Sequence, residues 1–417
     1  MGERGDMNKM EGATRELEVE EPPAGVAGAD AKQGPGDRER AVGTREPQFA
    51  RWPRYRRAAL GFRGHWYPVM WSRRLHRKPV AILILGEEIV LIRHQGAVHA
   101  LHDRCPHRGI PLSIGKREFP GTISCIYHGW TFDLCTGRLV AALTDGPDSP
   151  IVGKVRIRTY PVVERKGLIW IYVGVPEPPH IEEDVPAEFL ADDAFLAGRI
   201  TIRAGNWRYA AENGFDESHS KMLHRDAAWM LFRFLPAYML THVAPADDGF
   251  ITRMVDKVGY ETDYPGLGRW PRPRIWRLKK GRATVSIRLP GILRVRYKGW
   301  THYEWYVPTD PDHHRYLQFM CKRAAPLGRL ATSVRYWSYI RWCFHWRFNN
   351  QDSHVVELMP TRSHPERLFR PDSSITAWRK LCESDRGTET PDPREDATGM
   401  PPTARAALPM QGKRDVG

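Results

Sequence analysis

Residues 105–130 read CPHRGIPLSIGKREFPGTISCIYHGW and contain two short motifs that each combine a cysteine with a histidine. Cys105 and His107 form the first motif, and Cys125 and His128 form the second, after seventeen intervening residues. Such a set can hold a tetrahedral zinc ion, or a [2Fe–2S] cluster with cysteine on one iron and histidine on the other. Zinc modules usually pair Cys with Cys and His with His, whereas both motifs here are mixed, so the pattern favours the cluster.

Short apolar and β-branched runs surround these motifs and predict antiparallel strands. Gly86 and Gly96 separate the first runs, and the pair Thr136 and Gly137 is typical of a hairpin turn. The expected strands cover residues 80–85, 89–93, 98–102, 122–126, 130–133, 138–141, 155–160 and 168–173. Their regular spacing predicts a small antiparallel β-sandwich or barrel-like domain, which we place at residues 49–175.

A second group of metal-binding residue types lies in residues 206–224, NWRYAAENGFDESHSKMLH. His219 and His224, with one carboxylate, would form a facial triad that leaves positions open on Fe(II). Asp216 precedes His219 by three residues, so on a helix it lies on the same face and can hydrogen-bond that ring. Histidines five residues apart are separated by about 140° on an ideal helix. We therefore expect the helix to end or bulge around Ser220–Leu223.

The carboxylate of this triad is not fixed by spacing alone. Glu212, Asp216 and Glu217 lie nearby in sequence. A further candidate is Asp352, which stands in an aromatic-rich segment with FNNQDSHVVE at residues 348–357. An acid there either binds the metal or belongs to a solvated helix face.

The part of the chain that follows the Pro-rich residues 174–180 mixes helical and strand patterns. Strands are expected at residues 250–258, 283–289, 293–297, 302–308 and 315–322. Helices are expected over residues 206–224, over residues 331–359, and over residues 375–382 with Asp372 or Ser373 as N-cap. Strands enclosed by helices predict an α+β domain, which we place at residues 176–384.

The two ends of the chain, residues 1–48 and 385–417, lack a periodic apolar pattern, and we expect both to be disordered tails. The net charge of +14 belongs to the body, because residues 1–50 hold seven Lys and Arg against eleven Asp and Glu, and residues 385–417 hold five against six. A basic body suits a nucleic acid, an anionic surface or an acidic protein. Without a lysine-rich block or a nucleic-acid motif, we expect no nucleic-acid partner and favour an acidic electron donor.

Four cysteines have no Cys or His at ligand spacing, and we expect them to be small buried hydrophobic side chains: Cys135, Cys321, Cys343 and Cys382. No secretory signal opens the chain, so we expect reduced thiols and a cytoplasmic location. The longest apolar run, residues 227–240, is interrupted by Arg233 and Pro236, so no membrane span is expected. Residues 222–238 are expected either to line a substrate pocket or to form plain core.

Together, these motifs resemble the α subunits of the Rieske non-haem iron ring-hydroxylating oxygenases over residues 55–384. The chain is most similar to the carbazole dioxygenase group, in LGFRGHWYPVMWS (60–72), ENGFDESH (212–219), LPGILRV (289–295), YEWYVPTD (303–310) and AWRKL (377–381). The resemblance implies an N-terminal antiparallel β Rieske domain followed by a helix-grip α+β catalytic domain. That group has one residue fewer between its two iron histidines, so carbazole is not assumed to be the substrate.

The resemblance also implies two cofactors and their ligands. The [2Fe–2S] cluster would be held by Cys105, His107, Cys125 and His128. The mononuclear Fe(II) would be held by His219, His224 and Asp352. Catalytic roles are predicted for Asp216 and Asn213. Asp216 would bridge His219 to the cluster histidine, matching His128, of a neighbouring subunit in a head-to-tail homotrimer.

The implied function is that of a terminal oxygenase component. It would receive electrons from a ferredoxin or reductase, with NAD(P)H upstream, and insert oxygen from O₂ into an aromatic or heteroaromatic compound. One alternative is a Rieske monooxygenase, demethylase or desaturase that acts on a bulky apolar substrate such as a steroid. A second alternative is a non-catalytic Rieske electron carrier, which would not need the mononuclear site.

Overall fold

The computed structural model describes residues 51–394, apart from residues 176, 225–226, 228–237, 259–262, 265–267, 270–283, 298 and 361–365. The predicted tail at residues 1–48 and most of the predicted C-terminal tail therefore lie outside the described residues. The same holds for most of the expected pocket lining between residues 222 and 238. None of the described helices is long and apolar enough to cross a membrane.

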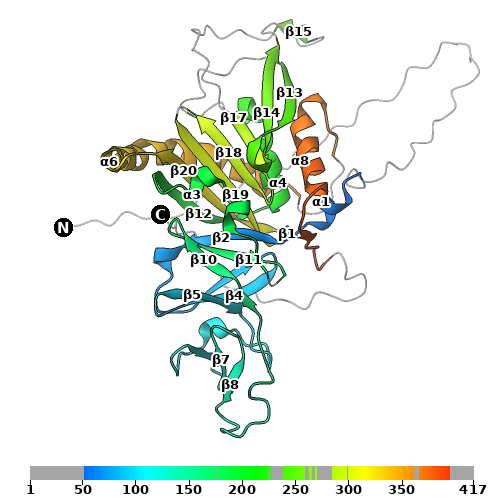
Figure 1. Cartoon of the computed structure of the whole chain (residues 1–417). Coiled ribbons are helices and arrows are strands. Elements are labelled where there is room, and N and C mark those ends of the chain that lie inside the picture. The colour runs from blue at the N-terminus through cyan, green and yellow to red at the C-terminus, as the bar shows by residue number, and fades with distance from the viewer. Residues whose placement is uncertain are drawn as a thin grey trace, which may run out of the picture. The chain divides into compact units, whose positions relative to one another are not determined.

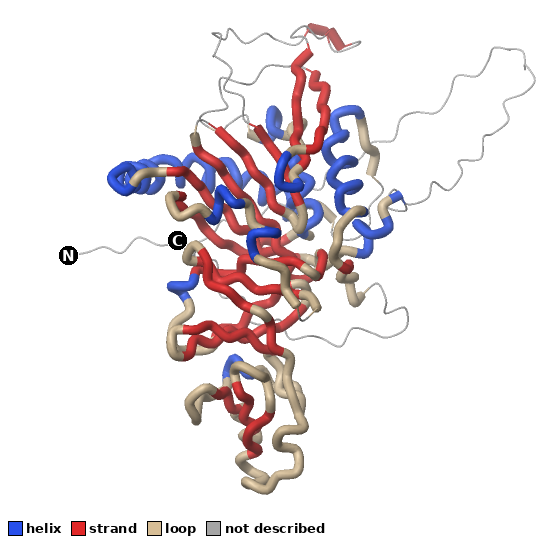
Figure 2. Tube along the Cα trace, viewed as in Figure 1, coloured by secondary structure: helices blue, strands red, loops and turns tan. Residues whose placement is uncertain are grey.

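The N-terminal region is built from three antiparallel sheets (Figures 1 and 2). One holds β3 (Val80–Ile84), β4 (Glu87–His94), β5 (Ala97–His102) and β9 (Thr159–Tyr160). A second holds β10 (Val162–Arg165), β11 (Leu168–Val173) and β2 (His65–Trp71), and a third holds β6 (Thr122–Ser124), β7 (Trp130–Asp133) and β8 (Leu139–Ala142). Short helical turns are α1 (Pro53–Arg57), η2 (Ser72–Arg74) and η3 (Leu112–Ile114). The predicted antiparallel β domain is confirmed, although β2 and β10 had not been predicted.

The C-terminal region is organised around one seven-stranded antiparallel sheet. Its order is β12 (Ala194–Ala204), β20 (His313–Arg323), β19 (Trp300–Asp310), β18 (Ile292–Tyr297), β17 (Thr284–Arg288), β14 (Ile251–Val258) and β13 (Tyr238–Pro245). A two-stranded sheet joins β15 (Asp263–Tyr264) and β16 (Gly268–Arg269). Five of the seven strands had been predicted within three residues, and the α+β fold class is confirmed.

Helices accompany this sheet (Figure 2). They are α2 (Ile181–Asp184), α3 (Ala187–Leu190), α4 (Trp207–Phe215), α5 (Ser220–Leu223), η4 (Asp247–Gly249), α6 (Pro326–Arg335), η5 (Tyr336–Phe348), α7 (Asn349–Leu358), η6 (Arg370–Asp372) and α8 (Ser373–Glu383). Helix α8 begins after the N-cap Asp372, as predicted. The helix expected over residues 331–359 is instead three segments, because η5 is π-helical. A π turn bonds i to i+5 and shifts which side chains face the sheet, an irregularity that often accompanies functional sites.

The two faces of strands β19 and β20 have different neighbours, because successive side chains of a strand point to opposite sides. On one face, Trp305 and Phe319 pack with Trp170 and Phe189 in a large apolar cluster that includes residues of both regions. On the other face, Glu304 accepts a hydrogen bond from Asn349 of α7 over 2.6 Å. The apolar face therefore anchors the sheet, while the opposite face is turned toward the helices.

Residues 385–394 form a C-terminal segment that belongs to the fold. The prediction of a disordered tail from residue 385 onward is therefore wrong for these residues. Strand β21 (Thr388–Glu389) pairs antiparallel with β1 (Phe62–Arg63). The Leu60 N–H donates to the Thr390 carbonyl over 2.8 Å. These pairings join two segments far apart in sequence, and residues 385–394 have no apolar period that could have revealed them.

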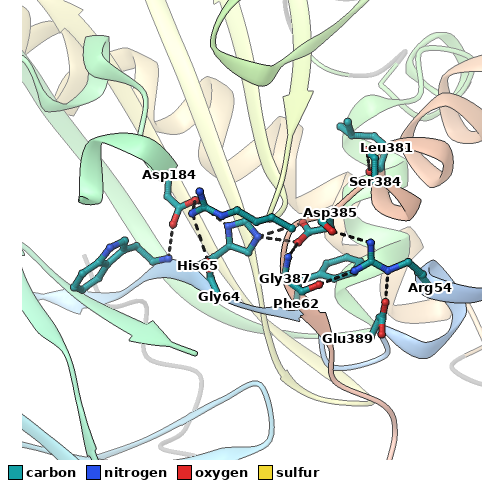
Figure 3. Close-up of polar contacts among 12 residues, drawn as sticks. Arg54, Phe62, Gly64, His65, Asp184, Leu381, Ser384, Asp385, Gly387 and Glu389 are labelled. Carbon is teal, nitrogen blue, oxygen red and sulfur yellow. Dashed lines mark hydrogen bonds and ion pairs between the residues drawn. The ribbon is translucent and has the colours of Figure 1, made fainter. Parts of the chain in front are cut away.

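A buried polar clasp holds this segment in place (Figure 3). His65 lies between Asp184 and Asp385, with its Nδ1 2.8 Å and its Nε2 3.1 Å from the respective carboxylates. Arg386 also approaches Asp184, at 2.8 Å. Burial by itself lowers the pKa of His65, but hydrogen bonds to the two carboxylates outweigh burial and raise this pKa to about 8. The clasp therefore prefers a protonated ring.

The clasp predicts a pH-dependent stability. A histidine whose folded pKa is raised stabilises the folded state fully below about pH 6.5, and this contribution is lost as the pH rises through about 8. The raised pKa corresponds to about 2 kcal/mol. We expect His65→Gln to lower the midpoint of thermal unfolding at pH 6 and to flatten its decline between pH 6.5 and 8.5. Equal declines in both proteins would contradict the assignment.

Candidate metal centres

The first candidate centre consists of two loops with the same main-chain geometry. The carbonyls of Cys105 and Cys125 accept hydrogen bonds from the N–H groups of Gly109 and Gly129, over 2.8 and 3.0 Å. Both glycines have positive φ, +72° and +65°, a conformation that favours glycine over other residues. The glycine after each motif thus closes a tight loop.

The two loops bring their cysteines together and their histidines together. Both cysteines are buried, and burial together with the neighbouring Cys125 thiol raises the pKa of Cys105 to about 11. The rings of His107 and His128 lie with centroids 4.5 Å apart, and His107 stacks on Trp130. His128 Nδ1 is buried without a hydrogen-bond partner among the described residues. A thiol pair beside an imidazole pair is the donor set of a Rieske cluster, so these residues fit a [2Fe–2S] group whose cysteines bind as thiolates.

The second candidate centre gathers side chains from α4, α5 and α7. Asp352 Oδ1 lies 3.3 Å from His219 Nε2, 3.1 Å from His224 Nε2 and 3.0 Å from Asn213 Nδ2. Among the described residues, His219, His224 and Asp352 are the one group of three whose ligand atoms all lie within 4.8 Å of one another. Two imidazoles and a carboxylate in this arrangement match a facial triad for Fe(II).

The far nitrogens of both imidazoles are held by separate partners. His219 Nδ1 is 3.0 Å from Asp216 Oδ2, and His224 Nδ1 is 2.9 Å from Gln351 Oε1. The ring of Phe348 stacks on His224 at a centroid distance of 3.6 Å. Acceptors at Nδ1 place the proton there and leave the Nε2 lone pairs directed at the centre. His224 Nε2 accordingly faces Asp352 Oδ1, at 3.1 Å.

The electrostatics of the site favour a cation. Burial alone lowers the pKa of His219, yet hydrogen bonds to Asp216 and Asp352 raise it to about 9. Burial alone raises the pKa of Asp352, yet hydrogen bonds from both histidines hold it well below its usual range. A bound metal ion would take the place of the extra proton, so the residues fit a mononuclear Fe(II).

Comparisons with known proteins agree with both centres. Residues 65–161 match the Rieske [2Fe-2S] domain, and residues 172–261 and 249–388 match the homotrimeric ring hydroxylase domain. The chain is 36% identical over 374 residues to the terminal oxygenase component of carbazole 1,9a-dioxygenase from a Sphingomonas species, covering 81% of this chain and 96% of the relative. The corresponding component from Metapseudomonas resinovorans is 35% identical over 367 residues, covering 81% and 95%.

A solved structure agrees as well. The reduced complex between oxygenase and ferredoxin in carbazole 1,9a-dioxygenase superposes with a TM-score of 0.73 at 32% identity, covering 85% of this chain and 97% of that one. The chain belongs to the homotrimeric ring hydroxylases. It is a Rieske-type terminal oxygenase, an oxidoreductase with a [2Fe–2S] cluster and a mononuclear iron. The domain limits at residues 175 and 384 stay predictions.

The ring hydroxylase directs its other nearby acids away from the candidate iron site. Glu212 is buried against Arg379, with a Glu212 Oε1 to Arg379 Nε distance of 2.6 Å. Glu217 pairs with Arg253 over 2.6 Å. Both had been open alternatives for the carboxylate ligand, as had Asp216, which contacts Nδ1 of His219 instead. Among the described residues, Asp352 is the acid within reach of both imidazoles at Nε2.

The helix irregularity that the histidine spacing required is present, but its predicted position is wrong. Ser220–Leu223 is itself the short helix α5, and the breaks lie on either side of it. Helix α4 ends at Phe215, Asp216 adopts an extended ψ of 140°, and His224 caps the end of α5. Asp216 accepts hydrogen bonds from the N–H groups of Ser218 and His219, which stabilises the break before α5.

Two features of the ring hydroxylase were missed or misjudged from sequence. The sequence analysis missed Gln351. Its contact with His224 joins two distant segments, and no local sequence pattern indicates such a contact. Cys135 is exposed, with its Sγ 3.9 Å from His99 Nδ1, because it lies at the hairpin turn after β7. The prediction of burial holds for Cys321, Cys343 and Cys382.

Gln351 provides a test of the imidazole geometry. Gln351→Leu removes the acceptor at His224 Nδ1, so the ring is no longer held toward the centre. We expect the affinity for Fe(II) to fall about 10–100-fold, with the cluster spectrum unchanged. Competition with an iron chelator, applied to cluster-loaded protein, measures this affinity. Glu217→Gln is the matched control and should bind iron as the parent does. An unchanged affinity in Gln351→Leu would contradict this role.

Proposed function

We propose that this terminal oxygenase takes electrons from a ferredoxin or reductase and inserts oxygen from O₂ into an aromatic or heteroaromatic compound. The observation that carries the proposal is the convergence of His219, His224 and Asn213 on one oxygen of Asp352. A simple electron carrier has no use for such a site. The basic body of the chain suits an acidic donor protein, and we place the enzyme in the cytoplasm.

The proposed cluster ligands are Cys105, His107, Cys125 and His128, and the proposed iron ligands are His219, His224 and Asp352. When bound, the cluster supplies single electrons, and the Fe(II) supplies open coordination positions and redox chemistry for O₂. The protein supplies the rest: Gln351 and Asp216 orient the two imidazoles, and Asn213 donates to Asp352 and so fixes the direction of its carboxylate.

Asp216 also provides a route for electrons. It is hydrogen-bonded to His219 Nδ1, and 12% of its side chain is exposed. We propose that in the homotrimer this exposed edge meets Nε2 of His128 of the partner subunit, because the buried Nδ1 of that ring is the nitrogen that would face the cluster. A hydrogen-bonded bridge of this kind would connect the cluster of one protomer to the iron of the next.

The function is tested by reconstituting the oxygenase with iron, a surrogate ferredoxin and reductase, and NADH under ¹⁸O₂. Fused aromatic compounds are screened as substrates. We expect a product that carries ¹⁸O and depends on both cofactors. Two labelled atoms in one cis-diol indicate dioxygenation, whereas one labelled atom indicates monooxygenation. Reduction of the cluster without any iron-dependent labelled product would contradict the proposal.

The route through Asp216 has its own test. Asp216→Ala, loaded with both metals in excess Fe(II), should turn over about 10–100-fold more slowly because the bridge is missing. A merely structural effect is separated by single-turnover kinetics, in which the rate of reoxidation of a pre-reduced cluster should fall in parallel. Glu217→Gln, which changes the adjacent acid, serves as the control. Normal reoxidation in Asp216→Ala with both metals loaded would end the relay hypothesis.

A further inference from the structure

The sheet face turned toward α7 and η5 is polar where a packed core is ordinarily apolar. On β19, His302, Glu304 and Tyr306 occupy alternate positions, which point to one side of the strand. On the facing helices, His345 and Asn349 are buried at positions four residues apart. The two rows touch, since Asn349 donates to Glu304 and the rings of His302 and His345 lie 5.4 Å apart.

At one end of this polar interior, the carboxylate of Glu304 has hydrogen-bond partners within the protein. Glu304 accepts hydrogen bonds from Asn349 Nδ2 and from the hydroxyls of Tyr306 and Tyr316. Burial raises the pKa of Glu304 to about 7, and these donors limit the rise. This end of the interior lies nearest the candidate iron site, because Asn349 precedes Asp352 by three residues on α7. The Glu304 carboxylate and the two tyrosine hydroxyls thus have protein partners, whereas Asn349 Oδ1 has none among the described residues.

At the other end of this polar interior, two histidine nitrogens lack hydrogen-bond partners. His302 Nε2 and His345 Nε2 are both buried and have no hydrogen-bond partner among the described residues. Their Nδ1 atoms face protein groups, at 3.5 Å from Glu304 Oε1 and 3.2 Å from the Tyr336 hydroxyl respectively. Burial lowers the pKa of both histidines, that of His302 to about 3, so both rings are neutral. Each neutral ring offers one N–H donor and one lone pair. Buried polar atoms of this kind are normally met by a partner.

The distance between the two rings suits one small group. A hydroxyl oxygen lies about 2.8 Å from each hydrogen-bond partner, so it can bridge nitrogens up to about 5.5 Å apart. The rings of His302 and His345 lie near enough for one such group to contact both, because their centroids are 5.4 Å apart. A hydroxyl both donates and accepts, and therefore complements a pair of neutral imidazoles.

The distance from this pair to the iron site sets the length of the ligand. His345 precedes Asp352 by seven residues, and the chain between them passes from the π-helical η5 into α7. At an α-helical rise of 1.5 Å per residue the separation along the helix is at most roughly 10 Å. Phe348 lies between them in sequence and stacks on His224 at 3.6 Å, which supplies an aromatic surface beside the iron site. An aromatic ring therefore lies beside the iron site, and the two unpartnered imidazole nitrogens lie farther from it.

We propose that His302 and His345 form a distal subsite that binds a hydroxyl group of the substrate, so that this enzyme prefers fused-ring compounds carrying a hydroxyl at the end remote from the carbon that is oxidised. The proposal rests on the proposed function, because it names the substrate class of the same site. It distinguishes this chain's substrate from an unsubstituted aromatic hydrocarbon.

The experiment measures equilibrium binding of three probes to the iron-loaded enzyme under anaerobic conditions without reductant. Phenanthrene carries no hydroxyl, 2-hydroxyphenanthrene carries one at the end of its long axis, and 9-hydroxyphenanthrene carries one at its side. Because no turnover is required, a failure of the subsite is distinguishable from a failure of the oxygenation reaction. The intrinsic fluorescence of the probes reports their binding.

We expect the parent enzyme to bind 2-hydroxyphenanthrene at least about tenfold more tightly than either other probe, because only its hydroxyl reaches both imidazoles. His302→Phe and His345→Phe should each remove most of this preference while binding phenanthrene at least as well. The matched control is His314→Gln, which changes a buried histidine of β20 whose Nδ1 already has the Gly205 carbonyl as partner, at 2.8 Å. This variant should keep the preference.

Iron content and the midpoint of thermal unfolding verify that each variant is folded. If the two Phe variants do not fold, the comparison of the three probes with the parent enzyme decides alone. Equal binding of the three probes by the parent enzyme would overturn the proposal, and so would an undiminished preference in folded His302→Phe and His345→Phe. Oxygenation of phenanthrene without any hydroxyl preference would overturn the subsite and leave the proposed function standing.

Discussion

The candidate iron site depends on a single carboxylate oxygen. Asp352 Oδ1 receives Asn213 Nδ2 and two imidazole nitrogens within 3.3 Å, and those nitrogens come from chain segments more than a hundred residues away. Asp216 and Gln351 hold the Nδ1 atoms, so the two Nε2 atoms and the carboxylate oxygen converge as possible metal ligands. A metal ion at their meeting point would take the place of the extra proton that the raised pKa of His219 indicates. The local structure, from the break at Asp216 to the irregular helix before α7, serves to hold these atoms together.

The seven-stranded sheet supports this site because one of its faces is apolar and the other is polar. Trp305 and Phe319 bury one face in the apolar cluster shared with the N-terminal region, which makes the sheet a rigid platform. The alternate residues Glu304 and His302 turn the other face into a polar interior beside α7 and η5. Rigid elements hold reactive groups more accurately than loops do. The cluster motifs lie instead on paired loops, where glycine permits tight turns, His107 is exposed and His128 is half-buried.

Much of this arrangement could be predicted from local patterns. The Cys–His motifs, the strands around them and the N-cap Asp372 are encoded within a few residues each. Contacts between distant segments could not be predicted in the same way. Spacing left Glu212, Asp216, Glu217 and Asp352 as open candidates. Only tertiary packing pairs Glu212 with Arg379 and Glu217 with Arg253. The pairing of β21 with β1, the π-helical segment and the Gln351 contact likewise depend on the folded chain, which residue patterns alone do not record.

The most direct test of the account is iron quantification combined with electron paramagnetic resonance, applied to the parent protein and to Asp352→Ala. The account predicts about three irons per parent chain and a reduced-cluster signal, because two irons belong to the cluster and one to the triad. Asp352→Ala should lose about one iron per chain and keep the cluster signal unchanged. A parent protein with about two irons per chain, or an Asp352→Ala variant with its full iron content, would contradict the central claim.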